Sequence, residues 1–481
     1  MQFPKALLID GKLRPEATGG RLRLIEPATE QLLCEVPAAG KPEVDEALEA
    51  ASRAFATARW ARIPAPQRSA ILLKVAALIR DHADRLAELE ARNAGKPIGD
   101  ARWEINAGAR CFEYYAGAVS ALLGETIPTS GEGFDYTLRV PVGVVAAIVP
   151  WNFPFLMACW KVAPALVTGN AVVLKPASLT PLSALELGRL ALEAGVPPGI
   201  LQVLAGPGSE IGDYLVSHSG VRKIAFTGET TTGARIMKLA ADDLKRVSLE
   251  LGGKSPNIIF ADADVDAAAA AAPMSVFANT GQDCCARSRV LVEATVYEQF
   301  VERFVAATRE LVVGEPLDDK TQIGPMVSAN QRERVEAYID EARHNGARVL
   351  VGGDRTRAKG WYLAPTILDG LDSHARACQE EIFGPVACVI PFRDEAEAIQ
   401  LANDTQYGLA GSLWTRDLER GLRVARAVET GVLSVNTNSS VYQEAPFGGF
   451  KRSGFGRDLG LDAMRLYTET KNVFIRVRES S

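Results

Sequence analysis

The chain has 481 residues, of which 47% are hydrophobic and 23% are charged, and its formal net charge is −6. Because a single core stops growing at ~250–300 residues, we expect two or three domains. The acidic balance and the absence of a long basic run argue against nucleic acid or an anionic membrane as a partner.

The composition also argues against export, membrane insertion and structural metal. The first 20 residues lack a charged start followed by an apolar core, so no secretory signal is expected. The most apolar region, 140–174, is too interrupted for a span of ~20 apolar residues, and it fits two buried strands around a helix. The seven cysteines are odd in number and form no CxxC pair, which predicts a reduced, cytoplasmic protein with no bound metal.

The first 142 residues combine helices with a ribbon. Apolar residues at three- and four-residue spacing predict helices over 43–60 and 67–92. Turn residues followed by a strand-like alternation over 124–142 predict an extended ribbon.

From Gly143, short apolar strands alternate with helices. The strands are expected at 143–149, 171–175, 201–204 and 223–226. The helices between and after them are expected to begin near Phe155, Pro181, Ser209 and Thr230. This alternation implies parallel pairing in a doubly wound sheet, which binds its ligand at the carboxyl ends of the strands.

A second alternating series, from Asn257 to about Ser434, indicates a separate α/β unit. It includes a helix over 264–279, a strand over 288–292 and a helix over 295–313. The composition over 466–477 is again typical of a strand.

A cysteine pair follows the predicted helix 264–279, in the segment Gly281-Gln282-Asp283-Cys284-Cys285. A loop that flanks a helix can present a thiol to a cleft and lower its pKa below the free value of ~8.5. Small buried hydrophobic side chains are the alternative interpretation. These residues alone leave both open.

Glu250 lies between two leucines at the end of a predicted strand and precedes Gly252 and Gly253. Apolar neighbours raise the pKa of a carboxyl group and suit it to general-base catalysis. An exposed carboxylate at a strand end is the alternative. The paired glycines indicate that something approaches the backbone closely.

Two further strand ends carry polar groups. Asn152, in Pro150–Pro154, could donate a hydrogen bond to a developing oxyanion, or could belong to a rigid turn with aromatic packing. There is no GxGxxG motif. Instead, 226–233 connects a strand to a helix start, where backbone amides can meet a phosphate. Lys175 could bond a cofactor hydroxyl or be merely solvated.

Seven motifs, in this order, resemble signatures of the aldehyde dehydrogenase superfamily over nearly the whole chain. They are PWNFP (150–154), LKPA (174–177), FTGETTTG (226–233), LELGGKSP (249–256), GQDC (281–284), EIFGPV (381–386) and PFGGFKRSG (446–454). The resemblance implies an α/β fold with three parts and a homodimer or homotetramer. The parts are a Rossmann-like doubly wound cofactor domain (1–118 and 142–252), a second α/β catalytic domain (253–448) and a small β oligomerisation ribbon (119–141 and 449–481).

The resemblance also implies roles for single residues. Cys284 resembles the nucleophile, Asn152 with the Cys284 amide resembles the oxyanion hole, and Glu250 resembles the base that activates the deacylating water. The implied cofactor-binding residues are Trp151, Lys175, Ser178, Gly228, Glu229, Gly233, Glu381 and Phe383. The implied substrate pocket comprises Phe153, Met157, Trp160, Asp283, Cys285, Val441 and Phe447.

The implied reaction oxidises an aldehyde to a carboxylic acid with NAD or NADP, through a thiohemiacetal and a thioester on Cys284. Ser178 stands where strongly NAD-selective members carry a glutamate, so we expect use of both cofactors, with NAD slightly favoured. Glu229 stands where a serine near the pyrophosphate is common, so we expect it to point away. The pocket set has one acid and no base, which favours medium-sized neutral aldehydes or amino-aldehydes attracted by Asp283.

Three alternative functions compete with this interpretation. A cysteine hydrolase would need a histidine beside the thiol, and the four histidines lie in no motif. A phosphorylating or CoA-acylating semialdehyde dehydrogenase would not need Glu250. A non-catalytic structural protein on the same fold would have no need of Cys284, Glu250 and Asn152 together.

Overall fold

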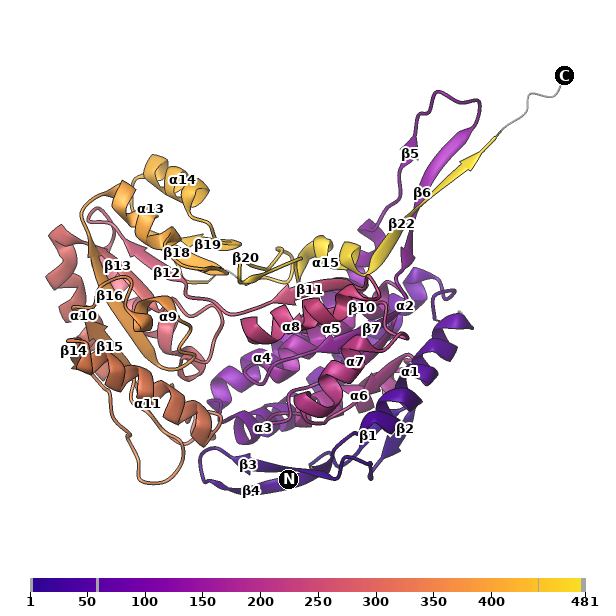
Figure 1. Ribbon diagram of the computed structural model, residues 1–481, viewed down its shortest axis with the longest axis horizontal. Coiled ribbons are helices and arrows are strands. Elements are labelled where there is room, and N and C mark those ends of the chain that lie inside the picture. The colour runs from indigo at the N-terminus through magenta and orange to yellow at the C-terminus, as the bar shows by residue number, and fades with distance from the viewer. Residues whose placement is uncertain (1–2, 58–59, 440, 477–481) are drawn as a thin grey trace.

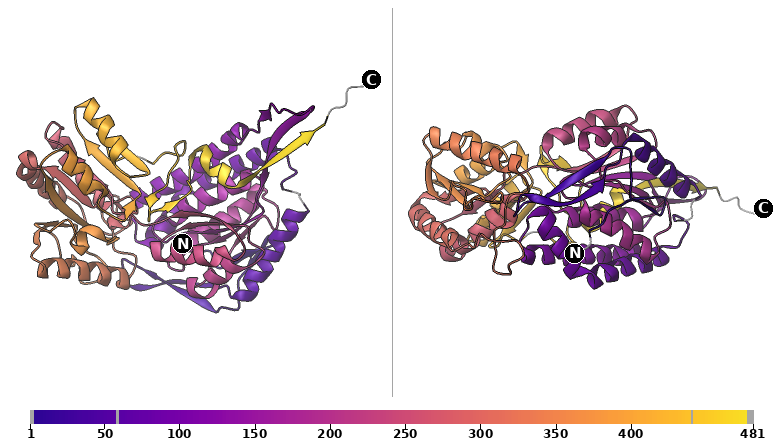
Figure 2. Two further views of the ribbon diagram at one scale, coloured as in Figure 1. Left: turned by 45° about the horizontal axis from the view of Figure 1, so that its top comes forward. Right: turned by 90° about the horizontal axis from the view of Figure 1, so that it is seen from below.

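Two β-sheets, each flanked by helices, form the two halves of the computed structural model, and a narrow ribbon projects from one half (Figure 1). The structure describes residues 3–57, 60–439 and 441–476. The halves remain distinct when the molecule is turned (Figure 2). The α/β fold class predicted from the sequence is therefore confirmed.

The first sheet has eight strands in the order β2-β1-β9-β8-β7-β10-β11-β21. Its middle strands β9, β8, β7, β10 and β11 are parallel. The four predicted strands are all present and buried along their length, because a parallel sheet is covered on both faces. The strands are β1 (Leu7–Ile9), β2 (Lys12–Arg14), β7 (Val144–Ile148), β8 (Ala171–Lys175), β9 (Leu201–Val203), β10 (Lys223–Thr227), β11 (Arg246–Glu250) and β21 (Gly454–Phe455).

The helices of this half differ from the prediction at two places. The helix predicted over 67–92 is two helices, because the backbone at His82 (φ −108°, ψ 14°) leaves the helical region. Helix α4 is absent from the predicted elements. Its Gly108 has a packing role, since a Cβ there would lie 2.7 Å from the Phe155 ring. The helices are α1 (Lys41–Ala56), α2 (Ala65–Asp81), α3 (Ala83–Ala94), α4 (Ile98–Ala118), α5 (Pro154–Val167), α6 (Leu182–Ala194), α7 (Asp213–Ser217) and α8 (Thr230–Ala241).

The second sheet has seven strands in the order β14-β15-β16-β13-β12-β18-β19, parallel except for the pair β14 and β15. They are β12 (Pro256–Ile259), β13 (Arg289–Glu293), β14 (Arg348–Val351), β15 (Thr366–Asp369), β16 (Val386–Phe392), β18 (Ala410–Trp414) and β19 (Val432–Val435). One hydrophobic cluster packs it against α9 and α10, and another against α11 to α14. These helices are α9 (Val265–Phe277), α10 (Tyr297–Arg309), α11 (Ala329–His344), α12 (Arg376–Gln379), α13 (Glu395–Asn403) and α14 (Leu418–Ala427).

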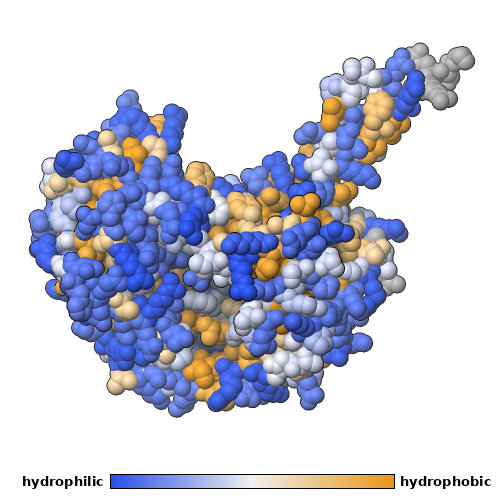
Figure 3. Space-filling model, viewed as in Figure 1, coloured by the Kyte–Doolittle hydropathy of each residue, from blue (hydrophilic) through white to orange (hydrophobic). Residues whose placement is uncertain are grey.

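The ribbon is a three-stranded antiparallel sheet made of β5 (Thr126–Ile127), β6 (Phe134–Pro141) and β22 (Thr468–Ile475). The predicted ribbon and the predicted C-terminal strand thus lie side by side, although position 477 is outside the described residues. Exposed apolar side chains are visible along the ribbon (Figure 3). They include Ile127, Phe134, Leu138, Phe474 and Ile475.

Short elements complete the chain. They are β3 (Arg21–Glu26), β4 (Gln31–Pro37), β17 (Tyr407–Gly408), β20 (Phe450–Lys451) and α15 (Gly460–Leu466). Strand β21, within the C-terminal segment 449–481, pairs with β11 of the first sheet. Across 3–57, 60–439 and 441–476, no helix has both the length and the apolar content needed to cross a bilayer.

Candidate active site

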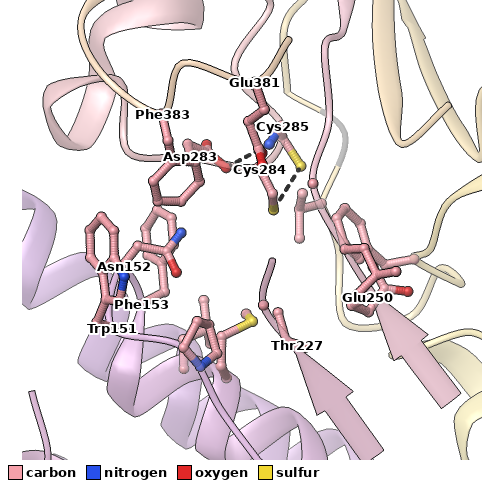
Figure 4. Close-up of a pocket in the computed structure, with 18 of the residues that line it drawn as sticks. Trp151, Asn152, Phe153, Thr227, Glu250, Asp283, Cys284, Cys285, Glu381 and Phe383 are labelled. Carbon is pink, nitrogen blue, oxygen red and sulfur yellow. Dashed lines mark hydrogen bonds between the residues drawn. The ribbon is translucent and has the colours of Figure 1, made fainter. Parts of the chain in front are cut away.

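A cavity of about 330 Å³ lies where the two halves meet. Its walls come from the loop after β7, the end of β11, the loop before β13 and the loop after α12 (Figure 4). The carboxyl ends of β7, β10 and β11 face it, at the edge where a parallel sheet is expected to bind its ligand.

Most of the predicted site residues line this cavity. All three predicted catalytic residues and all seven predicted substrate-pocket residues do so. Five of the predicted cofactor residues are also in the wall: Trp151, Gly228, Glu229, Glu381 and Phe383. The other three, Lys175, Ser178 and Gly233, lie outside it.

These three residues have other surroundings. The Nζ of Lys175 donates to the Pro176 carbonyl at 3.2 Å, and burial lowers the pKa of this lysine to about 8. The Ser178 hydroxyl donates to the Gly206 carbonyl at 2.9 Å. A Cβ at position 233 would lie 2.6 Å from the Leu251 side chain. Close packing of α8 is therefore one reason for Gly233.

Cys284 is half-buried, and its Sγ lies 3.9 Å from the Sγ of Cys285. The pKa of Cys284 is raised well above its usual value by the hydrogen bond with Cys285, by burial, and by Asp283 and other nearby negative groups. The expected lowering of this pKa is therefore wrong. The loop follows the C-terminal end of α9, where the helix dipole is negative and does not stabilise a thiolate.

Glu250 ends β11 and is buried, and neither of its carboxylate oxygens has a hydrogen-bond partner within the described chain. Burial, and next the charge of Asp458, raise its pKa well above the usual value, while Lys161 acts in the opposite direction. The predicted direction is thus confirmed. Its carboxylate points away from the Cys284 thiol (Figure 4). A Cβ at Gly448 would lie 2.6 Å from Glu250 Oε1, so this glycine leaves room for the carboxylate.

A buried ion pair lies near Glu250. The Nζ of Lys161, on α5, is 2.8 Å from Oδ2 of Asp458. Both side chains are almost completely buried, and both charges act on the Glu250 carboxyl group. The protonation of Glu250 therefore depends on the balance between these two partners.

Asn152 directs its amide at the loop that carries the cysteine. Its Nδ2 donates to the Gln282 carbonyl at 3.0 Å. Asn279, which the sequence did not single out, bridges the same segments, because its Nδ2 donates to the carbonyls of Asn152 (2.9 Å) and Gln282 (3.2 Å). Asn279 has φ +50° and is followed by Thr280 with φ +59°. Asparagine tolerates this left-handed conformation better than most residues. The backbone conformation that favours asparagine here is visible only in the structure, so the sequence could not single out Asn279.

A buried charged group supports the start of α5. The Nζ of Lys96 lies 4.1 Å from the centre of the Phe153 ring and forms a fully buried ion pair with Glu104. Oε1 of Glu104 accepts a hydrogen bond from the Leu156 amide at 3.0 Å, in the first turn of α5. This group fixes the segment that follows Asn152.

On the opposite wall, Glu381 and Gly384 approach the glycines of two other motifs. Oε1 of Glu381 accepts a hydrogen bond from the Gly253 amide at 3.0 Å, and burial raises the pKa of this glutamate to about 7. The Phe383 ring stands edge-on to Trp151, with 5.1 Å between ring centres. A Cβ at Gly281 would lie 2.2 Å from the Gly384 carbonyl oxygen, so these two backbones touch.

The wall contains residues that were not predicted. Trp103 of α4 lines the cavity and is 55% exposed. Arg287 and Arg334 also line it. The cavity therefore contains basic residues, whereas the predicted substrate pocket had none. Nη1 of Arg287 donates to the Cys285 carbonyl at 2.7 Å. Trp103 was missed because α4 is absent from the predicted elements, so only the fold shows that this side chain reaches the cavity.

Comparisons with known proteins agree with this arrangement. The model of the aldehyde dehydrogenase family matches residues 14–473. Betaine aldehyde dehydrogenase 1 of Oryza sativa subsp. japonica is 43% identical over 478 residues, which cover 98% of this chain and 95% of the relative. Aminoaldehyde dehydrogenase 2 of Zea mays is 43% identical over 479 residues, with the same coverage.

A solved structure is equally similar. An indole-3-acetaldehyde dehydrogenase of P. syringae, in complex with NAD+ and IAA, superimposes with a TM-score of 0.98 at 41% identity. The match covers 99% of this chain and 97% of that protein. Sequence and structure thus agree over almost the whole length, and the chain belongs to the aldehyde dehydrogenase family.

Proposed function

We propose that this chain oxidises an aldehyde to the carboxylic acid with NAD or NADP, with Cys284 as nucleophile, Asn152 as oxyanion donor and Glu250 as base. One observation carries the proposal. These three residues come from three separate elements and meet at one cavity of about 330 Å³ between the two sheets. A thiol, an amide donor and a buried carboxyl group are the side chains that acyl transfer to water requires.

The chain's residues fit a nicotinamide dinucleotide at the carboxyl ends of the parallel strands. Lys175 uses one donor, in a 3.2 Å bond to its neighbour's carbonyl, and so retains donors for a ribose hydroxyl. Glu381 accepts one hydrogen bond at Oε1, which leaves acceptor capacity for a second ribose. When bound, the cofactor supplies the oxidising power by taking up a hydride.

Asn152 can stabilise the alkoxide that forms when the thiolate adds to the aldehyde carbon. Its Nδ2 carries two hydrogens. One is donated to the Gln282 carbonyl, which fixes the amide, and the other is available to the oxyanion. The loss of one such donor typically costs on the order of 100-fold in rate.

Glu250 is proposed to take a proton from the water that attacks the thioester. The new C–O bond forms as the C–S bond breaks, which releases the acid and leaves Cys284 as a thiolate, to which the proton held by Glu250 can return. The carboxylate points away from the sulfur, so it must turn toward the cavity for this step (Figure 4). Gly448 leaves room for the position that the carboxylate holds in the structure, before this turn.

Dual cofactor use remains part of the proposal. Ser178 is half-buried and its hydroxyl is directed at Gly206, so no carboxylate at this position opposes a 2′-phosphate. Glu229 is exposed and lines the cavity, and its expected orientation away from the pyrophosphate stays a prediction.

The proposed substrate is a medium-sized neutral aldehyde or an amino-aldehyde. Six aromatic side chains line the wall, and Trp160 packs edge-on to Phe447 with 5.2 Å between ring centres. Asp283 supplies a negative charge beside the thiol. The rice and maize relatives are named for betaine aldehyde and for aminoaldehydes, which supports an amino-aldehyde. The positive charge of Arg287 would instead favour a semialdehyde that bears a carboxylate. The Nη1 of this arginine, however, donates to the main-chain carbonyl of Cys285.

We further infer a homodimer or homotetramer built on the ribbon, whose exposed apolar side chains support association. The proposed domains are those expected from the sequence: 1–118 with 142–252, 253–448, and 119–141 with 449–481. A cytoplasmic location is supported by the seven cysteines, all free, since a catalytic thiol requires a reducing compartment.

The test is formation of reduced nicotinamide, followed by absorbance, with an aldehyde panel and both cofactors. The wild-type protein should oxidise aldehydes to acids, and Cys284→Ala should lose the activity while it keeps binding the cofactor. Cys285→Ala is the matched control, since it removes the neighbouring sulfur. Turnover that survives Cys284→Ala, or ester cleavage without any aldehyde oxidation, would overturn the proposal. Better turnover of succinic semialdehyde than of amino-aldehydes would overturn the substrate assignment alone.

A further inference from the structure

The loop before β13 brings together three groups that bind metal ions. Asp283, Cys284 and Cys285 present one carboxylate oxygen and two sulfurs, all within 4.8 Å of one another. The two sulfurs lie side by side at the cavity, 3.9 Å apart (Figure 4). Within the part of the chain that the structure describes, this is the only such group of three.

The spacing of the sulfurs matches a tetrahedral metal centre. With Zn–S bonds of about 2.3 Å and tetrahedral angles, two sulfurs on one zinc ion lie about 3.8 Å apart. The observed separation of 3.9 Å therefore needs almost no rearrangement of the two sulfurs. Three protein ligands leave a fourth position for water, as in zinc sites that are open to solvent.

The surroundings also favour a cation. Asp283 is fixed, because its Oδ1 accepts a hydrogen bond from the Cys285 amide at 2.8 Å. Its negative charge acts on the Cys284 sulfur. Arg287, which also lines the cavity, donates from Nη1 to the Cys285 carbonyl at 2.7 Å. Paired sulfurs select soft cations over magnesium or calcium.

We propose that Asp283, Cys284 and Cys285 form a binding site for a thiophilic divalent cation such as Zn²⁺ or Cd²⁺, and that its occupancy reversibly inhibits the enzyme. The metal replaces the thiol protons and engages the lone pairs of Cys284 that would attack the aldehyde. Binding and turnover then exclude each other, and a chelator reverses the inhibition.

A second thiol pair in the chain provides an internal comparison. Cys378 and Cys388 share a hydrogen bond and are both buried. The Cys388 sulfur also donates to the Ala377 carbonyl at 3.3 Å. No carboxylate completes a three-ligand group there, among the residues the structure covers. This pair therefore tests whether paired thiols alone are sufficient.

The experiment adds CdCl₂ to the reduced, metal-free protein and follows the ultraviolet charge-transfer band of the cadmium–thiolate bond. One ion should bind per chain, and ZnCl₂ should compete with it. Cys285→Ser and Asp283→Asn should each weaken binding by at least about tenfold, a loss of about 1.4 kcal/mol. Cys378→Ala should leave the band and the affinity unchanged.

Inhibition is the second readout, expressed for each variant relative to its own metal-free rate. The Zn²⁺ concentration that halves the rate should rise at least tenfold in Cys285→Ser and Asp283→Asn and stay unchanged in Cys378→Ala. Equal sensitivity in all variants, or a band lost only in Cys378→Ala, would overturn the proposal. The band does not depend on aldehyde turnover, so its result stands apart from the proposed function.

Discussion

The side-chain amide of Asn279 joins the main-chain carbonyl of Asn152 at 2.9 Å, and so ties the loop of the oxyanion donor to the loop of the nucleophile. The same nitrogen also donates to the Gln282 carbonyl, two residues before Cys284. The distance between the amide donor and the thiol is thus set partly by a third residue, in addition to the direct bond from Asn152 to the Gln282 carbonyl. Asn279 is a positioning residue in this arrangement.

The first prediction concerns this bridge. Asn279→Asp keeps the size of the side chain but replaces the donor with an acceptor that faces two carbonyl oxygens. We expect kcat to fall on the order of 10–100-fold, because a misplacement of ~1 Å can cost that much. Steady-state kinetics measure the effect.

Asn279→Gly separates the bridge from backbone strain, since glycine accepts φ +50° but has no amide. It should lose activity as well. Thr280→Ala is the control, because it removes one buried hydrogen bond, to the Gly324 carbonyl, without touching the bridge. A Thr280→Ala variant as impaired as Asn279→Gly would argue against the positioning role.

The second prediction is the pH dependence of thioester hydrolysis. Burial raises the pKa of Glu250, and the base works only when deprotonated, so the rate should rise with pH through that pKa. Asp458→Asn removes a charge that raises the pKa, and should move the midpoint to lower pH. Lys161→Met removes a charge that lowers it, and should move the midpoint to higher pH. Profiles of kcat at saturating substrate measure both, and shifts in the same direction would refute the assignment.

The third prediction tests cofactor choice at Ser178. Ser178→Glu places a carboxylate where the 2′-phosphate of NADP is expected, so kcat/KM with NADP should fall at least about tenfold, since ~1.4 kcal/mol of repulsion suffices. The value with NAD should change far less. Ser178→Ala, which loses the bond to Gly206 but adds no charge, is the matched variant. An equal loss with both cofactors would mean that the 2′-phosphate of NADP does not lie near residue 178.

The fourth prediction concerns the ion pair beneath Phe153. Lys96→Met leaves Glu104 buried and unpaired, which should lower the free energy of unfolding by about 3–5 kcal/mol. Thermal unfolding would detect this change. Lys96→Met combined with Glu104→Gln should recover part of the stability, because position 104 then carries no unpaired buried charge. No recovery would mean that the lysine acts through its packing on Phe153.

The sequence predicted the parts of this fold whose residue pattern is visible within one continuous segment of the chain. The parallel strands β7 to β10 were recognisable because strands covered on both faces are continuous apolar runs. Helix α4 was not, since Gly99, Gly108 and Gly117 interrupt its apolar pattern. Of these three, only Gly108 is explained by the fold, because a Cβ there would lie 2.7 Å from the Phe155 ring of α5.

The same limit applies to the site. Motif order located Cys284, Glu250 and Asn152, and the cavity includes all three. The raised pKa of Cys284 could not be anticipated, because it depends on the hydrogen bond to Cys285 and on burial in the folded protein. Asn279 and Trp103 are equally invisible in the motifs. Their contributions arise from backbone conformation and from a helix distant in sequence.

The contact between Gly281 and the Gly384 carbonyl has a consequence for protein engineering. Two loops separated by about a hundred positions rest on each other main chain to main chain, with no side chain between them to absorb an adjustment. An insertion or a grafted sequence in the loop that carries Glu381 would therefore displace the nucleophile directly. Redesign of cofactor recognition on that side must treat both loops as one mechanical unit.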